Sequence, residues 1–332
     1  MGRLRYTISR LLQAIPVILG VITITFLLTD AIPGDPVSIM LGPSPSAQQA
    51  AAIRAKFGLD QPLHIRYLNY LVDVIQLDLG TSLYYQVPVT EKIAERLPIT
   101  LYLLLSSFTF ALLTAVPLGI ISAKRRNTAT DHVSRVVALF GVSTPSFWIG
   151  LMLIIVFSYW LGYFPATNLI LPWTSPSQID GASTQVDVIV KSIHHLILPT
   201  ITLGTLQMAA FTRIERSSML EVLGEEYVKL ARAYGVSERT ILRKHAFRNA
   251  QLPLITLVGL QLTSALGGAV LTETVFSING MGRLIITAIQ NQDFQLVMGT
   301  TLVFGLVFVI GVIVTDLSYA YVDPRVSFED SE

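Results

Sequence analysis

The chain has 332 residues, of which 52% are hydrophobic and 14% are charged. Soluble domains carry about 25% charged residues, so this composition and a mean hydropathy of +0.60 indicate an integral membrane protein. The sequence contains no cysteine, which excludes disulfides, thiolate metal sites and a cysteine nucleophile. The net charge of +1 says little, because in a membrane protein the distribution of charge matters more than its sum.

Six segments without Asp, Glu, Lys or Arg approach or exceed the roughly 20 residues that a helix needs to cross the hydrocarbon. They are residues 11–29, 97–123, 136–163, 196–212, 250–272 and 294–315. We therefore expect an all-α integral membrane protein with six transmembrane helices.

Three arginines precede the first segment, as in a signal peptide, but its apolar run is longer than a signal core and "TDAIPGDP" lacks a small-residue cleavage site. We expect this first helix to remain uncleaved.

The distribution of positive charge predicts the orientation. Six spans place both termini on one side of the membrane, and the segments on that side carry 16 of the 23 Lys and Arg residues. The more basic side faces the cytoplasm, so both termini and a loop at about 213–250 are predicted to be cytoplasmic. We divide the chain into residues 1–96, the first helix with an extracytoplasmic segment, and residues 97–332, a five-helix core.

Two extracytoplasmic segments have contrasting local patterns. Residues 47–57 look helical, whereas "FPATNLILPWTSPSQIDGASTQ" is rich in Pro and Ser and predicts irregular structure.

The cytoplasmic stretch "GEEYVKLARAYGVSERTILRKHAFRNAQLPLI" is a dense run of charge in an apolar chain. Its pattern predicts a helix, a glycine turn and a second helix. Gly235 lies where a C-cap glycine would, with Val236 available for the apolar contact that accompanies it. Ser237 is a suitable N-cap for the next helix, and Pro253 lies near the start of the fifth span. One helix face, at i, i+3, i+4 and i+7, consists of Tyr227, Leu230, Ala231 and Tyr234.

Three kinds of partner could contact this loop. "LARAYGVSERTI" has the look of a DNA-binding helix-turn-helix, but a duplex would have to lie against an anionic membrane face that repels it. A surface for lipid headgroups would use the basic residues Arg213, Arg216, Lys244 and Arg248. Acidic residues are interleaved with them, namely Glu221, Glu225, Glu226 and Glu238. A surface of mixed sign favours a protein partner.

The same stretch resembles the cytoplasmic coupling loop of permeases of binding-protein-dependent ABC importers, most closely the dipeptide and oligopeptide (peptide/nickel) branch. Further motifs agree in chain order: "IPGDP" at 32–36, "FGLDQP" at 57–62, "DLGTS" at 78–82, "SSMLEVLGEEY" at 217–227, "LTETVFS" at 271–277 and "DPR" at 323–325. The resemblance implies the type I ABC importer permease fold. The chain departs from the family pattern at Lys229-Leu230, where the signature begins Glu-Ala, at Leu77 before "DLGTS", and at Asn279 in "FSING".

The resemblance also implies functional residues. In the family the short helix before the loop glycine docks into a groove on a cytoplasmic ATPase. The matching positions here are Glu226, Tyr227, Ala231, Arg232, Ala233 and Gly235, followed by His245, Arg248, Asn249, Leu252 and Pro253.

The loop "ETVFSINGMGRL" is predicted to form a tight turn between spans five and six. In the family the corresponding loop faces the substrate-binding protein, and the matching residues are Phe276, Asn279, Gly280 and Gly282. A plain connecting turn is the alternative.

The energy source is expected on a partner. No G-x4-G-K-[ST] motif occurs and no lysine follows a glycine, so the chain lacks a phosphate-binding loop. ATP and Mg are expected on partner ATPase subunits, with no cofactor or metal on this chain, which is not expected to be an enzyme.

Two other classes of protein fit the sequence less well. An ion-coupled secondary transporter buries ionisable groups at mid-membrane, and the six span interiors contain none; Asp30, Glu273 and Asp316 lie at span ends, where we expect a hydrated interface. An intramembrane hydrolase lacks support, because there is no H-E-x-x-H and the adjacent His194 and His195 do not face one another as i, i+4 ligands would.

The sequence does not determine which residues line the translocation path. Hydroxyl groups in the spans either line it or bond back to their own helices; they are Thr100, Ser106, Ser107, Thr109, Thr114, Ser143, Thr144, Thr263 and Ser264. Pro145 either opens a kink at a gate or makes a packing kink.

The sequence thus predicts a permease subunit that imports di- or oligopeptides across a prokaryotic cytoplasmic membrane. The alternative cargoes are nickel chelates, glutathione-like tripeptides and oligosaccharides. The implied partners are a second homologous permease, two ATPase subunits, an extracytoplasmic substrate-binding protein and membrane lipid, with no nucleic acid.

Overall fold

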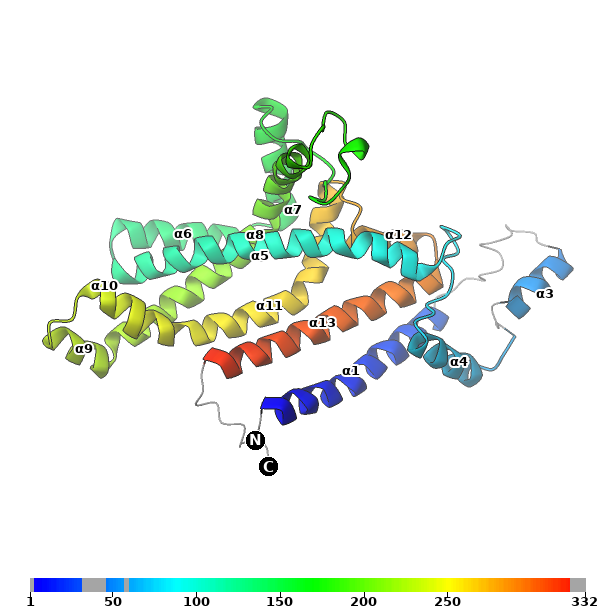
Figure 1. The fold of residues 1–332 in the computed structure, drawn as a ribbon, viewed down its shortest axis with the longest axis horizontal. Helices are drawn as coiled ribbons and strands as arrows, with labels where there is room; N and C mark the ends of the chain where they lie inside the picture. Colours follow the sequence, from blue (N-terminus) through cyan, green and yellow to red (C-terminus); the bar gives the residue numbers. More distant parts are fainter. Residues whose placement is uncertain (1–2, 32–45, 57–59, 323–332) are drawn as a thin grey trace. The chain divides into compact units, whose positions relative to one another are not determined.

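The computed structural model describes residues 3–31, 46–56 and 60–322 (Figure 1). Over these ranges the chain is helical, and its only β-pairing is an isolated bridge between Thr81 and Pro88. The expectation of an all-α protein is therefore confirmed for the part of the chain that the structure describes. The motifs "IPGDP" and "DPR" and the first three residues of "FGLDQP" lie outside these ranges.

The helices follow one another along the chain with short connections. They are α1 (Arg3–Ala31), α3 (Ala47–Lys56), α4 (Leu63–Ile75), α5 (Val89–Lys124), α6 (Ala129–Ser143), α7 (Ser146–Leu153), the π-helix η1 (Ile154–Trp160), the 3-10 turn η2 (Pro176–Gln178), α8 (Gln185–Gly224), α9 (Glu226–Ala233), α10 (Glu238–Thr240), the π-helix η3 (Ile241–Ala246), α11 (Phe247–Val275), α12 (Met281–Gln290) and α13 (Phe294–Val322). The helix predicted at 47–57 is confirmed as α3, whereas α4 was not predicted.

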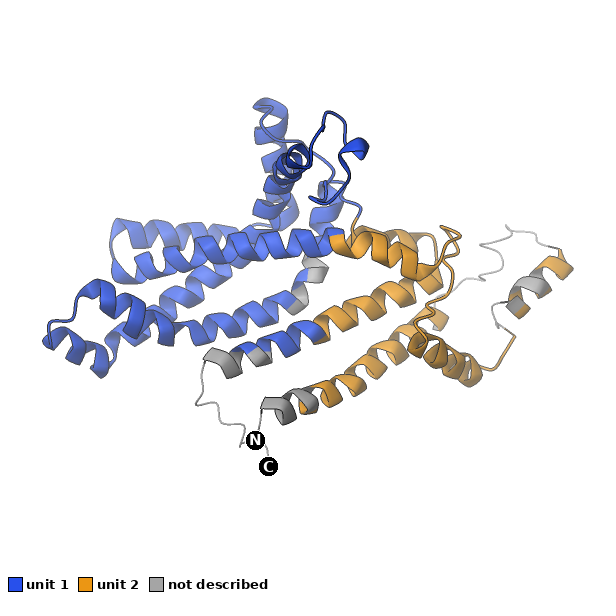
Figure 2. Cartoon of the chain, viewed as in Figure 1, with its two compact units in different colours: residues 1–7, 99–279, 310–332 blue, residues 8–98, 280–309 orange. Residues whose placement is uncertain are grey.

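The chain forms two compact units (Figure 2). Unit 1 comprises residues 1–7, 99–279 and 310–332, and unit 2 comprises residues 8–98 and 280–309. Residues 280–309 thus belong with the N-terminal part of the chain, although they are distant from it in sequence.

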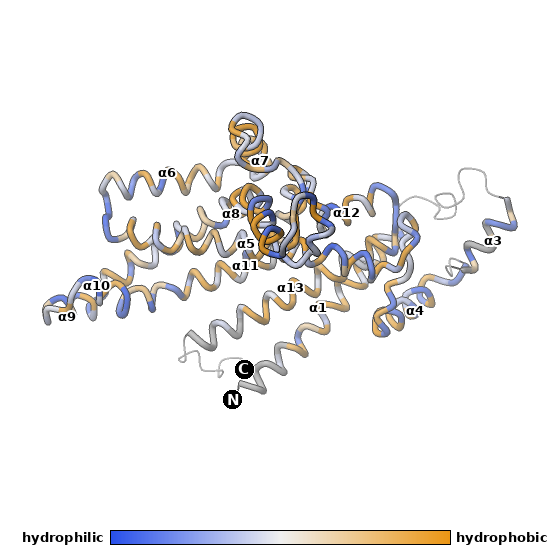
Figure 3. Tube along the Cα trace, turned by 45° about the horizontal axis from the view of Figure 1, so that its top comes forward, coloured by the Kyte–Doolittle hydropathy of each residue, from blue (hydrophilic) through white to orange (hydrophobic). Residues whose placement is uncertain are grey.

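Four helices are long and apolar enough to cross a membrane, and Figure 3 shows their apolar runs. They contain Leu11–Asp30, Val89–Lys124, Gln185–Gly224 and Phe294–Thr315. A fifth candidate is the pair Ala129–Ser143 and Ser146–Trp160, bent by 105°. The predicted fifth span, 250–272, lies within α11, which is not among these candidates.

The predicted third span, 136–163, is interrupted by a sharp bend at the predicted kink. The helix breaks at Thr144, whose φ of −94° and ψ of 128° are extended. The next residue is Pro145, whose ring disfavours the helical region for the residue before it. The break is therefore a corner rather than a mild kink.

The predicted tight turn between the last two spans is wrong. The chain leaves α11 at Val275 and forms the ten-residue helix α12 before α13 begins. The glycines at 280 and 282 start α12 instead of linking two spans directly.

In unit 2, the motif "DLGTS" contacts the start of α13. Ser82 Oγ donates to Asp293 Oδ2 over 2.5 Å, and the backbone N–H of Tyr84 donates to the same oxygen over 3.0 Å. The Thr81 N–H donates to Gln295 Oε1 over 2.8 Å. A side chain at Gly80 would collide with Gln295, whose Cδ lies 2.8 Å from the position of a Cβ.

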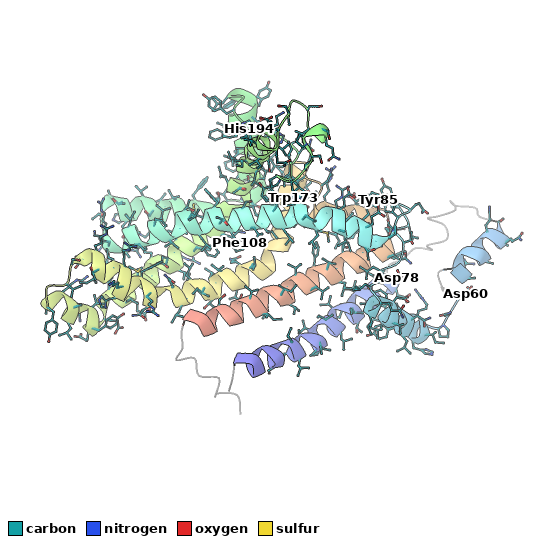
Figure 4. The ribbon with its side chains drawn as sticks, in the orientation of Figure 1. Asp60, Asp78, Tyr85, Phe108, Trp173 and His194 are labelled. Carbon is teal, nitrogen blue, oxygen red and sulfur yellow. The ribbon has the colours of Figure 1, made fainter. Side chains whose placement is uncertain are left out.

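In unit 1, the irregular segment after η1 is held by side chains from the first turns of α8. His194 Nε2 bonds to the Tyr163 carbonyl over 2.5 Å, His195 Nδ1 to the Thr167 carbonyl over 3.2 Å, and Ser192 Oγ to the Ile170 carbonyl over 2.6 Å. Figure 4 shows His194 and Trp173 in this region. The two histidines thus hold a loop, and the described residues contain no group of three potential metal ligands.

The acidic residues at the predicted span ends have different environments. Glu273 is fully buried and accepts a hydrogen bond from Thr100 Oγ1 over 2.6 Å, so its assignment to a hydrated interface is wrong. Asp30 is partly exposed and pairs with Arg66 over 2.7 Å. The side chain of Asp316 lies outside the described residues.

Candidate functional site

The charged loop forms a short helix that ends at a glycine. Glu225 is extended, with φ −66° and ψ 148°, and separates α8 from α9. Gly235 has φ +76°; its N–H donates to the Arg232 carbonyl over 2.9 Å, and the Val236 N–H donates to the Ala231 carbonyl over 3.1 Å. These two bonds define a Schellman motif, so the predicted glycine cap is confirmed. A Cβ on Gly235 would meet no atom within 4 Å, so glycine is needed here for its backbone conformation alone.

The second half of the loop is continuous with α11. Ser237 Oγ accepts a hydrogen bond from the Thr240 N–H over 3.4 Å, which confirms Ser237 as the predicted N-cap. The chain then passes through α10 and η3 into α11 without leaving the helical region. The helix α9 is therefore joined to α8 through Glu225 alone, and to α11 through the glycine turn, α10 and η3.

The base of the loop is packed tightly. A cluster of buried side chains joins the ends of α5 and α8 to η3 and α11, and consists of Ala123, Met219, Ala246 and Ala250. In α9 itself Val228 is fully buried, as is Ile241 in η3. The buried side chains make α9 a rigid attachment to the helices that carry it, because close-packed interiors transmit displacement.

A side-chain clasp joins the two halves of the predicted docking element. Asn249 Nδ2, on α11, donates to the hydroxyl of Tyr227 over 2.8 Å and to the His245 carbonyl over 3.0 Å. Arg232 Nε donates to Glu238 Oε1 over 2.7 Å across the glycine turn. The residues that the resemblance singled out on either side of Gly235 are thus brought into contact.

The outer face of the loop is apolar at its centre. Tyr227, Leu230 and Tyr234 are 40%, 56% and 80% exposed, and they belong to the face predicted from the sequence. Glu226 and Lys229 form an exposed ion pair of 2.7 Å beside them. Exposed apolar side chains beside charges of both signs form a surface that a protein groove can bind.

The remaining predicted docking residues surround this face with varied exposure. Ala233, Arg248 and Pro253 are exposed, whereas Ala231, His245 and Leu252 are half-buried. Arg216, considered above as a lipid-facing cation, instead pairs with the buried Asp131, so that interpretation is wrong for Arg216.

The residues predicted to face a binding protein are mostly buried. In unit 1, Phe276 is 1% exposed, its carbonyl accepts the Asn168 N–H over 2.9 Å, and Asn279 is exposed. In unit 2, Gly280 and Gly282 are buried. Of these four residues, only Asn279 is exposed.

Several candidate path hydroxyls bond to carbonyls of their own helix. Ser107, Thr109 and Thr114 donate to Leu103, Leu105 and Phe110, each over 2.7 Å. Ser106 does so to Leu103 and also contacts Thr200 Oγ1. The side chains of Thr263 and Ser264 lie outside the described residues.

Three buried acids were not identified from the sequence, namely Asp131, Glu215 and Asp293. Asp131 accepts bonds from Ser122, Asn127 and Arg216, and Glu215 is buried without a hydrogen bond to either carboxylate oxygen among the described residues. Each lies within eight residues of a predicted span boundary, where a charged residue is ordinarily assigned to the interface, so local pattern carries no signal of burial.

These features together define a helical membrane protein with a rigidly based helix exposed between two long helices. Residues 115–328 match the family described as binding-protein-dependent transport system inner membrane component, and residues 3–104 match the N-terminal region of such membrane components. The chain belongs to this family of inner membrane transport components.

Individual relatives are similar over nearly the whole chain. The oligopeptide transport system permease protein AppB of Bacillus subtilis is 38% identical over 324 residues, covering 97% of this chain and 99% of the relative. The dipeptide transport system permease protein DppB of Alkalihalophilus pseudofirmus is 40% identical over 332 residues, covering 98% and 100%. The glutathione transport system permease protein GsiC of Salmonella choleraesuis is 37% identical over 326 residues, covering 98% and 100%.

Proposed function

We propose that this chain is the permease subunit of an ABC importer that moves di- or oligopeptides across the cytoplasmic membrane. The observation that carries the proposal is α9, a Schellman-capped helix with an exposed apolar face and a buried base. Two relatives named as dipeptide and oligopeptide permeases, similar over nearly the whole chain, support the cargo.

The proposed role of α9 follows from its attachments. Leu230 and Tyr234 enter a groove on a cytoplasmic ATPase, while Val228 and the clasp between Tyr227 and Asn249 hold α9 to the permease. When the groove moves, α9 moves with it. The motion reaches α8 through Glu225 and reaches α11 through the capped turn, α10 and η3. The two helices then rock as rigid bodies, which opens the path alternately to each side.

The complete assembly is part of the proposal. Six spans with both termini in the cytoplasm place α9 on the ATPase side, with α11 as the span that completes the set. A second homologous permease contributes the other half of the path, two ATPase subunits bind ATP and Mg, and an extracytoplasmic binding protein delivers the cargo near Asn279. This chain itself holds no cofactor or metal and catalyses no reaction.

Glutathione is the second candidate cargo, favoured by the similarity to a permease named for glutathione transport. It is itself a small peptide, so a path for di- or oligopeptides suits it. The proposed transporter is the same for both cargoes, and the binding protein selects between them.

The cargo is tested by measuring ATP hydrolysis in lipid nanodiscs that contain the assembled complex. The binding protein is added empty, then loaded with di- to pentapeptides, then with glutathione. Stimulation of ATP hydrolysis by the peptides supports the proposal. Stimulation by glutathione alone would make glutathione the cargo instead. A complex that never recruits an ATPase would overturn the whole proposal.

The docking surface is tested by Leu230→Asp, with Lys229→Ala as the matched control on the same helix. Both side chains are exposed, so neither change disturbs the packing of the chain. We expect Leu230→Asp to abolish co-purification of the ATPase subunits and the control to retain it. Full co-purification of the ATPase subunits with Leu230→Asp would show that α9 is not the docking helix.

A further inference from the structure

The unpredicted helix α4 packs against the last turns of α1, within unit 2 (Figure 1). The hydroxyls of Tyr67 and Thr23 are 2.6 Å apart. The ring of Phe26 lies 5.3 Å from that of Tyr67 and 5.9 Å from that of Tyr70. One face of α4 is thus fixed to α1 by aromatic contacts and a hydrogen bond.

These contacts set the depth of α4 along α1. Arg66 pairs with Asp30 over 2.7 Å at the end of the apolar segment Leu11–Asp30. Thr23 lies seven residues earlier, which at about 1.5 Å per residue is about 10 Å further into that segment. Because Tyr67 reaches Thr23, α4 lies beside apolar helix that belongs inside the membrane rather than beyond it.

A second face of α4 is apolar and exposed. Leu68, Val72 and Ile75 follow one another at i, i+4 and i+7 and are 57%, 51% and 81% exposed. A second line at i, i+3 and i+7 is polar and consists of Arg66, Asn69 and Asp73. A short helix with this division has the pattern of a helix that lies in a membrane interface.

The neighbouring surface of α1 has the same character. In the turns that α4 covers, Ile24, Leu27 and Leu28 on the other side of α1 are 60%, 49% and 64% exposed. Only 17% of the apolar segment of α1 is buried within the chain. An exposed apolar surface at this depth meets acyl chains, and the outer face of α4 lies at the same depth.

We propose that α4 is an interfacial helix that lies in the membrane, with Leu68, Val72 and Ile75 against lipid. Asn69 and Asp73 face the headgroups and water, and Arg66 pairs with Asp30 on α1. Asp60 and Asp78, labelled in Figure 4, precede and follow the helix in the sequence. The helix thereby holds the outer end of α1 in the bilayer. This inference goes beyond transport and depends only on the membrane location of the family.

The chain lacks cysteine, so a single introduced cysteine is the one thiol on this chain and can be labelled before the complex is assembled. We would introduce Leu68→Cys, Val72→Cys, Asn69→Cys and Asp73→Cys separately and attach an environment-sensitive fluorophore to each. The complete complex would be reconstituted in nanodiscs of phosphatidylcholine or of the same lipid brominated on its acyl chains. A purified complex that still hydrolyses ATP establishes that each variant is folded.

At positions 68 and 72 we expect bromolipid to reduce the emission at least twofold. At positions 69 and 73 we expect little loss with bromolipid and strong quenching by aqueous iodide. Equal quenching by iodide at all four positions would overturn the proposal, because the helix would then lie in water. Protection of positions 68 and 72 from both quenchers would also overturn it and would assign this face to a protein partner.

Discussion

Arg216 on α8 forms a two-pronged ion pair with Asp131 in the first turn of α6. Its Nε and Nη2 atoms donate to Oδ1 and Oδ2 over 2.7 and 2.9 Å, and Asp131 is fully buried. Ser122 Oγ and the Asn127 N–H donate to the same carboxylate over 2.6 and 2.9 Å. The pair ties the connection between α5 and α6 to α8 ten residues before α9 begins.

Removal of the Asp131 carboxylate should destabilise unit 1. The change Asp131→Ala leaves a partly buried guanidinium and a hydroxyl without their acceptor, and breaking such a pair costs about 3–5 kcal/mol. The measurement is the thermal unfolding of the purified complex. Arg135→Ala serves as the control, because Arg135 approaches Asp131 only to 3.8 Å and is exposed, so its loss should cost under about 1 kcal/mol. Similar effects of the two changes would show that Arg216 is not the principal partner.

Replacement of Glu215 should stabilise the protein. Both of its carboxylate oxygens are buried without a hydrogen bond among the described residues, and a buried unpaired polar group costs about 1–3 kcal/mol. We expect Glu215→Met to raise the melting temperature, whereas Glu221→Gln, at an exposed position of the same helix, should leave it unchanged. A fall in melting temperature with Glu215→Met would reveal a partner for the carboxylate in the assembled transporter.

Substitution of Gly235 should uncouple ATP hydrolysis from uptake. Its φ of +76° is unfavourable for a β-branched residue, and Gly235→Val therefore strains the cap by about 1–3 kcal/mol, although a Cβ at this position meets no atom within 4 Å. The quantity to measure is the number of ATP molecules hydrolysed per peptide imported, which should rise severalfold. Gly224→Ala is the control, since a Cβ there also meets nothing within 4 Å and φ is not positive. An unchanged ratio in Gly235→Val would argue against a coupling role for the turn.

The Asp293 carboxylate should contribute to the stability of unit 2. It accepts hydrogen bonds from Ser82 and from the N–H groups of Tyr84 and Leu296. Asp293→Ala removes a helix cap, worth about 1 kcal/mol, and leaves the buried Ser82 hydroxyl without its acceptor, for about 1–3 kcal/mol more. Asp293→Asn, which retains an acceptor oxygen, should lose less than half as much stability in denaturant unfolding. Equal losses would show that charge rather than hydrogen bonding is what Asp293 supplies.

Some features were predictable because they depend on neighbours in sequence. The Gly235 cap needs only a glycine after a helical face, and the Ser237 cap needs only a hydroxyl before the next turn. Long apolar runs likewise identified α1, α5, α8 and α13, because a length of about 20 apolar residues is a property of the chain itself. The resemblance to importer permeases rests on ordered local motifs of the same kind.

Other features could not be predicted from the sequence, because they depend on which helices pack together. Glu273 and Asp131 have the sequence context of hydrated span ends, yet packing buries both and supplies Thr100 and Arg216 as partners. The corner at Pro145 was foreseen only as a kink, since the angle of a break is set by what the flanking helices pack against. The helix α4 carries both an apolar and a polar line of residues. Only its contacts with Thr23, Phe26 and Asp30 fix its position along α1.

By itself, the sequence determined the class of the protein, most of its long helices and the form of the loop that contains α9. These follow from hydropathy, helix capping and backbone conformation, all of which act within a few residues. The tertiary structure alone decided which charged groups are buried, how the two halves of the loop clasp each other and where α4 lies along α1. Those outcomes depend on contacts between residues tens to more than a hundred positions apart, for which a linear pattern holds no local signal.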